Sequence, residues 1–230
     1  MCSASVVFPR RSCRESSTRR RVMLIEHFTH RRNPFATRYV ASARLAPRDS
    51  RGRVLDLPAI VGRLGAIGGS GAIEGPHGTG KSTLLFHLSE VIAAESRPVV
   101  RIRMRSRGDA LGVLLAMRQA PRGGLACIDS WELLGTVGRS MVRCMARGLG
   151  IGLMVTSHGP TDLPTLVSCR GSRALLESLV GQLPGHGEWF GTTIIPADLD
   201  AAIVEAGEDL RKAFDLLYDR FERSRAGSSR

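Results

Sequence analysis

The chain has 230 residues, of which 43% are hydrophobic and 5% aromatic, and its formal net charge is +12. This length suffices for one α/β domain with a small appendage, whereas the low aromatic content and the 26 glycines argue against a β-sandwich or β-barrel. No run approaches the roughly 20 consecutive apolar residues of a membrane-spanning helix, so no membrane span is expected.

The five cysteines are odd in number and form no CxxC pair. A disulfide framework or a structural zinc site is therefore not expected. Cysteines without such pairing are typical of a reducing compartment, so the expected location is cytoplasmic. The cysteines are Cys2, Cys13, Cys127, Cys144 and Cys169.

Residues 1–54 hold most of the net charge, with thirteen arginines against three acidic residues, whereas the rest of the chain has a net charge of only +2. Such an Arg-rich leader can contact nucleic acid by neutralising phosphates, although it lacks the interleaved aromatic residues of a base-stacking surface. Residues 1–22 also have the composition of an organelle transit peptide, and a start at Met23 would remove them. A flexible segment is favoured over a dedicated nucleic-acid arm, and the other interpretations stay open.

Hydrophobic periodicity divides the rest of the chain into short strands and amphipathic helices. The predicted elements are, in chain order, a helix over 55–64, a strand over 71–74, a helix over 81–94, a strand over 98–106, a helix over 109–117, a strand over 125–128, a helix over 137–147, a strand over 151–155 and helices over 170–180, 196–206 and 208–222. Strands that alternate with helices in this way indicate an α/β fold, a three-layer αβα sandwich with a central parallel sheet.

The predicted strand over 98–106 has an unusual pattern, because arginines alternate with apolar residues along it. Arg101, Arg103 and Arg105 fall on one face. A strand with one polar face is typical of the edge of a sheet, so we expect this strand at an edge.

Residues 75–82 read Gly-Pro-His-Gly-Thr-Gly-Lys-Ser and match GxxxxGK(S/T), the phosphate-binding loop. Glycines let the backbone curl so that successive N–H groups point at phosphate oxygens, and the helix that follows adds its positive end. Lys81 is expected to neutralise the β- and γ-phosphates, and Ser82 to supply a hydroxyl ligand to Mg²⁺. The residues expected to contact the nucleotide are Gly75, Pro76, His77, Gly78, Thr79, Gly80, Lys81, Ser82 and Thr83.

Two observations favour a nucleotide site over a glycine-rich turn that matches the motif by chance. A short predicted strand precedes the loop and a strongly amphipathic helix follows it, which is the context that the motif requires. In addition, Lys81 is one of only two lysines in a chain with 31 arginines.

Asp129 directly follows the apolar run over 125–128, at the end of a predicted buried strand. A carboxylate in this position can hold the hydration shell of Mg²⁺ in a nucleotide-hydrolysing enzyme. The alternative is a helix N-cap formed by Asp129 or Ser130, and the two roles are compatible.

Residues 75–82 together with Asp129 resemble the P-loop NTPase superfamily. The resemblance extends to the division of this superfamily that contains the AAA+ and ABC-type ATPases, because the predicted strand over 151–155 ends in Thr156, Ser157 and His158. In this division an extra strand separates the loop-bearing strand from the aspartate-bearing strand. This resemblance implies that Thr156 or Ser157 faces the γ-phosphate or the attacking water. Small hydroxyl residues also occur at ordinary strand ends, which is the alternative.

The segment Glu208-Asp209-Leu210-Arg211-Lys212-Ala213 resembles the G-(D/N)-x-R segment of the lid domain in clamp-loader and replication-initiator AAA+ ATPases. The resemblance implies that Arg211 senses the γ-phosphate. Glu208 stands where the glycine belongs, however, and a solvated helix face is the alternative. The resemblance as a whole covers about residues 65–222, and it implies four parts, namely a leader over 1–57, a P-loop NTPase core over 58–195, a helical lid over 196–224 and a polar tail over 225–230.

One departure from the resemblance concerns catalysis. These ATPases carry a glutamate directly after the metal-binding aspartate, where it orients and deprotonates the attacking water. Here Ser130 stands in that place, and Glu132 is the nearest substitute, with Glu74 as another. We therefore expect hydrolysis to be slower than is usual for the family, with little effect on nucleotide binding.

The sequence therefore predicts an AAA+-like protein that binds ATP and Mg²⁺, hydrolyses ATP slowly and acts as a regulatory or motor module. A homo-oligomer is a further expectation. The chain lacks an NKxD motif and an LSGGQ-like stretch, which argues against a GTPase and an ABC-type ATPase. A small-molecule kinase and a nucleotide-gated binding protein with little turnover stay open. The residues expected to act in catalysis are Lys81, Glu132, Thr156, Ser157 and Arg211, and those expected at the metal are Ser82 and Asp129.

Overall fold

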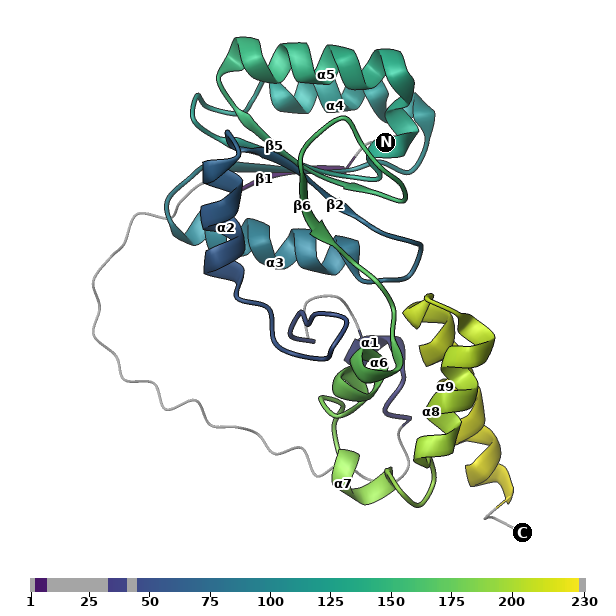
Figure 1. Cartoon of the computed structure of the whole chain (residues 1–230). Coiled ribbons are helices and arrows are strands. Elements are labelled where there is room, and N and C mark those ends of the chain that lie inside the picture. The colour runs from purple at the N-terminus through teal and green to yellow at the C-terminus, as the bar shows by residue number, and fades with distance from the viewer. Residues whose placement is uncertain (1–2, 8–32, 41–44, 228–230) are drawn as a thin grey trace.

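The computed structural model describes residues 3–7, 33–40 and 45–227 (Figure 1). The described elements are β1 (Ser3–Val7), α1 (Thr37–Val40), α2 (Leu57–Ala66), β2 (Ser70–Glu74), α3 (Lys81–Ala94), β3 (Val99–Arg103), a short turn of 3₁₀ helix (Arg107–Asp109), α4 (Ala110–Met117), β4 (Leu125–Asp129), a second 3₁₀ turn (Trp131–Leu134), α5 (Gly135–Leu149), β5 (Gly152–Ser157), β6 (Thr165–Ser168), α6 (Arg173–Val180), α7 (His186–Trp189), α8 (Pro196–Ala206) and α9 (Leu210–Gly227).

The sheet has the strand order β1-β3-β4-β5-β2-β6. The five strands from β3 to β6 in this order are parallel, and β1 pairs antiparallel with β3. Helices α4 and α5 cover one face of the sheet and α2 and α3 cover the other (Figure 1). The predicted α/β fold with a central parallel sheet between two helical layers is therefore confirmed.

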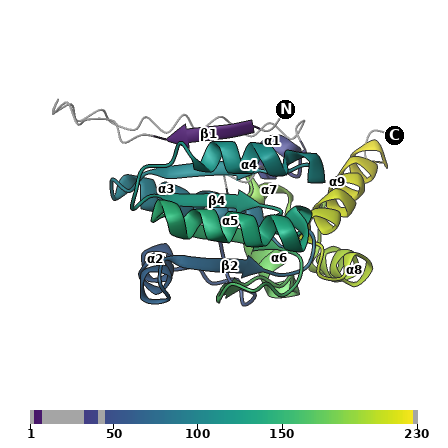
Figure 2. The same cartoon turned by 90° about the horizontal axis from the view of Figure 1, so that it is seen from above.

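The order of the inner strands also confirms a second prediction. Strand β5 lies between β2, which leads into the glycine-rich loop, and β4, which ends at Asp129. An additional strand therefore separates the loop-bearing strand from the aspartate-bearing strand. Both strands point toward the same edge of the sheet, and Figure 2 shows the C-terminal helices beyond that edge.

The sequence analysis misplaced one strand and did not predict β1 or β6. β3 is not at the edge of the sheet, because β1 pairs with its outer side over Val99–Arg103. The sequence analysis also missed β6, a four-residue strand with only one fully buried side chain, Leu166. Such a short, half-exposed run lacks the continuous apolar pattern by which buried parallel strands are recognised.

Each layer encloses its own group of buried apolar side chains. One group lies between the sheet and α4 and α5, and the second lies between the sheet and α2 and α3. A third group joins α6, α7, α8 and α9 around Trp189 and Phe221. The C-terminal helices therefore have a core of their own next to the sheet.

Part of the predicted leader belongs to this third core. Phe35 is 3% exposed and its ring lies 5.2 Å from the ring of Trp189, centroid to centroid. Asn33 Nδ2 donates to the carbonyl of Tyr218 and to Glu222 Oε1, at 3.0 and 2.8 Å. Hence this segment is built into the fold. Of the leader expected over residues 1–57, residues 1–2, 8–32 and 41–44 lie outside the described residues, so its contact with nucleic acid and the domain limits stay predictions.

Within the described residues, no helix combines the length and the hydropathy that crossing a membrane requires. The longest of them, α9, spans 18 residues and carries charged side chains along its whole length.

Replacing Phe35 by alanine tests whether this N-terminal segment stabilises the C-terminal helices. Because the ring is buried against Trp189 and other aromatic side chains, we expect Phe35→Ala to lower the free energy of unfolding by about 3 kcal/mol. Val204→Ala in α8 is the control, since Val204 is 83% exposed and its loss should cost less than about 0.5 kcal/mol. Equal denaturation midpoints for the two variants would show that the segment does not dock.

Candidate functional site

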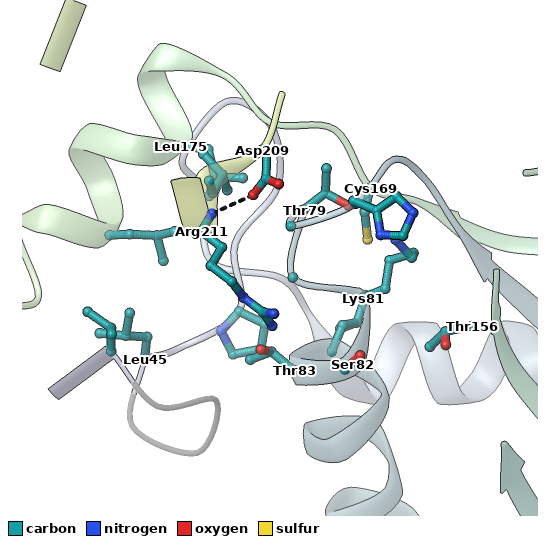
Figure 3. A pocket seen from close by; sticks show the side chains of 18 of the residues that line it. Leu45, Thr79, Lys81, Ser82, Thr83, Thr156, Cys169, Leu175, Asp209 and Arg211 are labelled. Atoms are coloured by element: carbon teal, nitrogen blue, oxygen red, sulfur yellow. Dashed lines mark hydrogen bonds between the residues drawn. The ribbon is translucent and has the colours of Figure 1, made fainter. Parts of the chain in front are cut away.

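A cavity of about 600 Å³ lies at the carboxyl edge of the sheet (Figure 3). Residues 77–84 of the glycine-rich loop and α3 form one wall, and the ends of β3, β4 and β5 form a second. The third wall comes from α6, α9 and the N-terminal segment. The cavity therefore brings together most of the residues that the sequence singles out, although Gly75 and Pro76 do not line it.

The loop between β2 and α3 depends on its glycines for its shape. Gly75, Gly78 and Gly80 have φ values of 152°, 69° and 87°, a region that L side chains rarely adopt. At Gly75 a Cβ would also overlap the carbonyl of Cys169. The motif glycines are therefore required by the conformation of this loop.

The start of α3 presents unpaired backbone donors to the cavity. In the described part of the chain, the amides of Gly80, Lys81, Ser82 and Thr83 donate no hydrogen bond to another protein group. The first amides of a helix have no partner within it and carry its positive partial charge. Four such donors beside a buried lysine fit an anion of the size and charge of a phosphate group.

Lys81 is buried beside these amides, with 6% of its surface exposed. Its Nζ donates to the carbonyl of Pro76 at 2.5 Å and to Nδ1 of His158 at 3.2 Å. Burial lowers the pKa of Lys81, and nearby acidic groups oppose this effect. The adjacent Cys169 does not neutralise it, because burial raises the pKa of that thiol to about 11 and leaves it protonated at neutral pH.

Asp129 is the meeting point of the predicted metal site. Its Oδ1 accepts hydrogen bonds from Ser82 Oγ at 2.8 Å and from Thr156 Oγ1 at 2.6 Å, and its Oδ2 lies 3.6 Å from Arg103 Nε. The two residues expected at the metal, Ser82 and Asp129, are therefore in direct contact.

No group of three or more histidine, cysteine or acidic residues with metal-binding geometry occurs among the described residues. A magnesium ion of the nucleotide-bound kind does not need such a group, because it takes most of its ligands from phosphates and water and only one or two from the protein. A hydroxyl and a carboxylate, here Ser82 and Asp129, are suitable donors for it.

Thr156 and Ser157, the two hydroxyl residues that the resemblance left as alternatives, have different surroundings at the end of β5. Thr156 lines the cavity, and its Oγ1 also accepts the amide of Ser130 at 2.9 Å. Ser157 does not line the cavity, and its Oγ instead accepts the amide of Gly159 at 3.4 Å. Of the two, only Thr156 therefore faces the cavity.

Glu74, one of the two substitutes for the missing glutamate, is engaged elsewhere. Its Oε1 accepts from the amide and the hydroxyl of Thr161, at 2.7 and 2.9 Å, and its Oε2 accepts from Thr165 Oγ1 at 2.9 Å. These bonds join β2 to the segment that leads into β6. The geometry therefore favours Glu132 over Glu74.

His158 is the residue of the site to which the sequence analysis assigned no role. Its Nδ1 faces Lys81, its Nε2 lies 3.0 Å from Glu132 Oε1, and its ring stacks on His77 with centroids 3.4 Å apart. Because the ammonium group of Lys81 can only donate, Nδ1 is the unprotonated nitrogen and Nε2–H donates to the carboxylate. The only signal in the sequence was the position of His158 next to Thr156 and Ser157 at the strand end.

Asp209, at the start of α9, contacts the glycine-rich loop. Asp209 caps α9, because its Oδ1 accepts the amides of Arg211 and Lys212 at 2.9 and 3.1 Å. A Cβ at Gly78 would overlap this carboxylate, so the cap of α9 touches the loop. Figure 3 shows the side chain of Arg211 directed into the cavity, which it lines together with Lys81 and Asp209.

Comparison with known proteins does not assign the chain to a family. No protein-family model matches it, and no curated protein matches it. Thirty-four chains of solved structures do match, among them that of PCH-2 from C. elegans, which is 11% identical with a TM-score of 0.37 over 74% of this chain and 67% of that chain. A likeness of this degree carries no argument about activity.

Gly78→Ala tests the contact between the loop and α9. We expect it to lower the free energy of unfolding by about 1–3 kcal/mol, because the new Cβ meets Asp209 in addition to the unfavourable φ. Gly80→Ala is the matched control, since it has a similar φ but open space around its Cβ. Chemical denaturation should show a larger loss for Gly78→Ala, and this excess should shrink in an Asp209→Ala background.

The environment of His158 predicts a dependence of stability on pH. Burial lowers the pKa of His158, and the charges of Lys81 and His77 lower it further against the opposing effect of Glu132. The unfolded state then binds more protons than the native state, so stability rises with pH between about pH 5 and pH 7. Denaturation across this range should give a flatter profile for His158→Gln, and an NMR titration should give a pKa of His158 below 6.5. A pKa above 6.5 would contradict the lowering of the pKa by burial.

Proposed function

We propose that this protein binds ATP with Mg²⁺ in the cavity, hydrolyses it slowly and acts as a nucleotide-driven regulatory or motor module similar to AAA+ ATPases. The observation that carries the proposal is the set of four unpaired amides at the start of α3, next to Lys81 and to the contact between Ser82 and Asp129. A phosphate chain satisfies all of these groups at once.

The phosphate end of the cavity is prepared for a charged ligand. The amides of residues 80–83 bind phosphate oxygens, and Lys81 exchanges the carbonyl of Pro76 and the ring of His158 for the β- and γ-phosphates. Ser82 and Asp129 hold Mg²⁺, which neutralises charge on the β- and γ-phosphates when it is bound. The resting hydrogen bonds of Lys81 keep its charge solvated by the protein until a phosphate replaces them.

The opposite end of the cavity is apolar and suits a nucleobase. Leu45 and Leu55 from the N-terminal segment, Leu175 and Leu179 from α6 and Phe214 from α9 line it. Apolar walls with few polar groups are typical of sites that hold the base of a nucleotide. A cavity with one anion-binding end and one apolar end supports a nucleotide as the ligand over inorganic polyphosphate.

Glu132 is the candidate general base for hydrolysis. Its Oε1 is held by His158, whereas its Oε2 is buried without a hydrogen-bond partner among the described residues. A carboxylate oxygen of this kind can accept a proton from an attacking water. Glu132 does not line the cavity, however, so its side chain has to turn before it can act, which supports slow turnover.

The same observation favours a second candidate, a nucleotide-gated binding protein with almost no turnover. Ser130 follows Asp129 directly, and the nearest free carboxylate is held outside the cavity by His158. In this case nucleotide binding alone would change the position of α8 and α9 through Asp209 and Arg211. Single-turnover assays separate the candidates, because only the ATPase releases phosphate within one binding event and loses that release in Glu132→Gln.

Lys81→Ala tests the binding site itself. We expect it to weaken binding of Mg·ATP by about tenfold or more, since it removes a charge-assisted hydrogen bond to the phosphates. Lys212→Ala is the matched control, because Lys212 is the other lysine of the chain and donates to the carbonyl of Glu205 on α8. Calorimetric titration should show wild-type affinity for Lys212→Ala, and unchanged ATP affinity in Lys81→Ala would remove the basis of the proposal.

A further inference from the structure

A second basic side chain faces the metal end of the cavity. Arg103 is the last residue of β3 and pairs in register with Asp129, the last residue of β4. Its Nε lies 3.6 Å from Asp129 Oδ2, and the side chain lines the cavity together with Lys81 and Ser82. The position of Arg103 follows directly from the parallel pairing of the two strands, since both end at the same edge.

The neighbouring arginines, Arg101 within β3 and Arg105 beyond its end, do not share this position. Arg101 is paired with Glu90 and lies over the ring of Phe86, at 5.1 Å from its centroid. Arg105 is exposed and does not line the cavity. Of these three, only Arg103 can reach a ligand at Asp129.

We infer that Arg103 binds the terminal phosphate of the nucleotide within the same chain and so distinguishes the triphosphate from the diphosphate. The inference rests on the proposed function. Arg103 is paired with Asp129 at 3.6 Å, and its side chain is 67% exposed whereas that of Asp129 is 12% exposed. Ion pairs with an exposed, flexible partner contribute little to stability, so Arg103 can exchange Asp129 for a stronger partner.

Asp129 is also the carboxylate that would hold Mg²⁺ together with Ser82. A bound cation would share the negative charge of Asp129, and the attraction of this carboxylate for Arg103 would then be weaker. The guanidinium group carries five N–H donors in a planar fork, which matches two oxygens of one phosphate group. Arg103 then binds the phosphate group nearest to Asp129, and this group is present in the triphosphate and absent in the diphosphate.

This assignment differs from the one that the sequence suggested for Arg211. Arg211 enters the cavity from α9, which packs in the C-terminal core, whereas Arg103 belongs to the central sheet. An arginine on the sheet keeps its place when the C-terminal helices move. Discrimination by Arg103 therefore does not require closure of these helices.

Equilibrium binding tests the inference without any dependence on turnover. We would titrate wild type, Arg103→Gln, Arg103→Lys and Arg105→Gln with a non-hydrolysable ATP analogue and with ADP, both with Mg²⁺. Arg103→Gln should weaken binding of the analogue about 10- to 100-fold, the range for a lost hydrogen bond to a charged group, and should change ADP affinity less than about twofold. Arg103→Lys should lose part of the effect, and Arg105→Gln none.

Other results would overturn the inference. An equal loss of affinity for both nucleotides would mean that Arg103 only maintains the position of Asp129. A gain of affinity for both would mean that Arg103 competes with Mg²⁺. If wild type binds neither nucleotide, both the proposed function and the inference are wrong. The role of Arg103 alone is refuted if wild type binds both nucleotides, Lys81→Ala loses this binding and Arg103→Gln keeps the nucleotide preference of wild type.

Discussion

The contact between Ser82 and Asp129 is the constraint on which the site depends. It joins the first turn of α3 to the end of β4, although β5 lies between β4 and the strand that leads into the loop. Thr156, at the end of β5, bridges the gap by donating to the same carboxylate oxygen as Ser82. Three parallel strands therefore have to end in register for a hydroxyl and a carboxylate to meet beside the loop amides.

Local sequence patterns predicted the elements and the loop well, because the physical signals for them are local. The helix over 81–94 and the helix over 196–206 have the bounds that the sequence predicted, since a glycine-rich loop marks the start of the first and Pro196 and Gly207 enclose the second. The meeting of Ser82 with Asp129 also follows from the motif, because both are expected to hold the same ion.

Contacts across the sheet could not be predicted in this way. Thr156 and Ser157 point to opposite faces of β5, and the sequence does not show which face looks onto the cavity. Arg103 and His158 act through neighbours that are distant in the chain, namely Asp129 on the adjacent strand and Lys81 on α3. Their positions depend on strand order and register, which hydrophobic periodicity does not encode.

The way in which Asn33 is held by Tyr218 and Glu222 has a consequence for the synthesis of the protein. These partners are 185 and 189 residues away from Asn33 in the chain, so the bonds form only after α9 has left the ribosome. Contacts of such sequence separation are slow to form because a long stretch of chain has to be ordered first. A nascent chain can therefore complete the sheet and the glycine-rich loop while the wall built from α6, α9 and the N-terminal segment is still incomplete, and the cavity gains its third wall only in the last folding step.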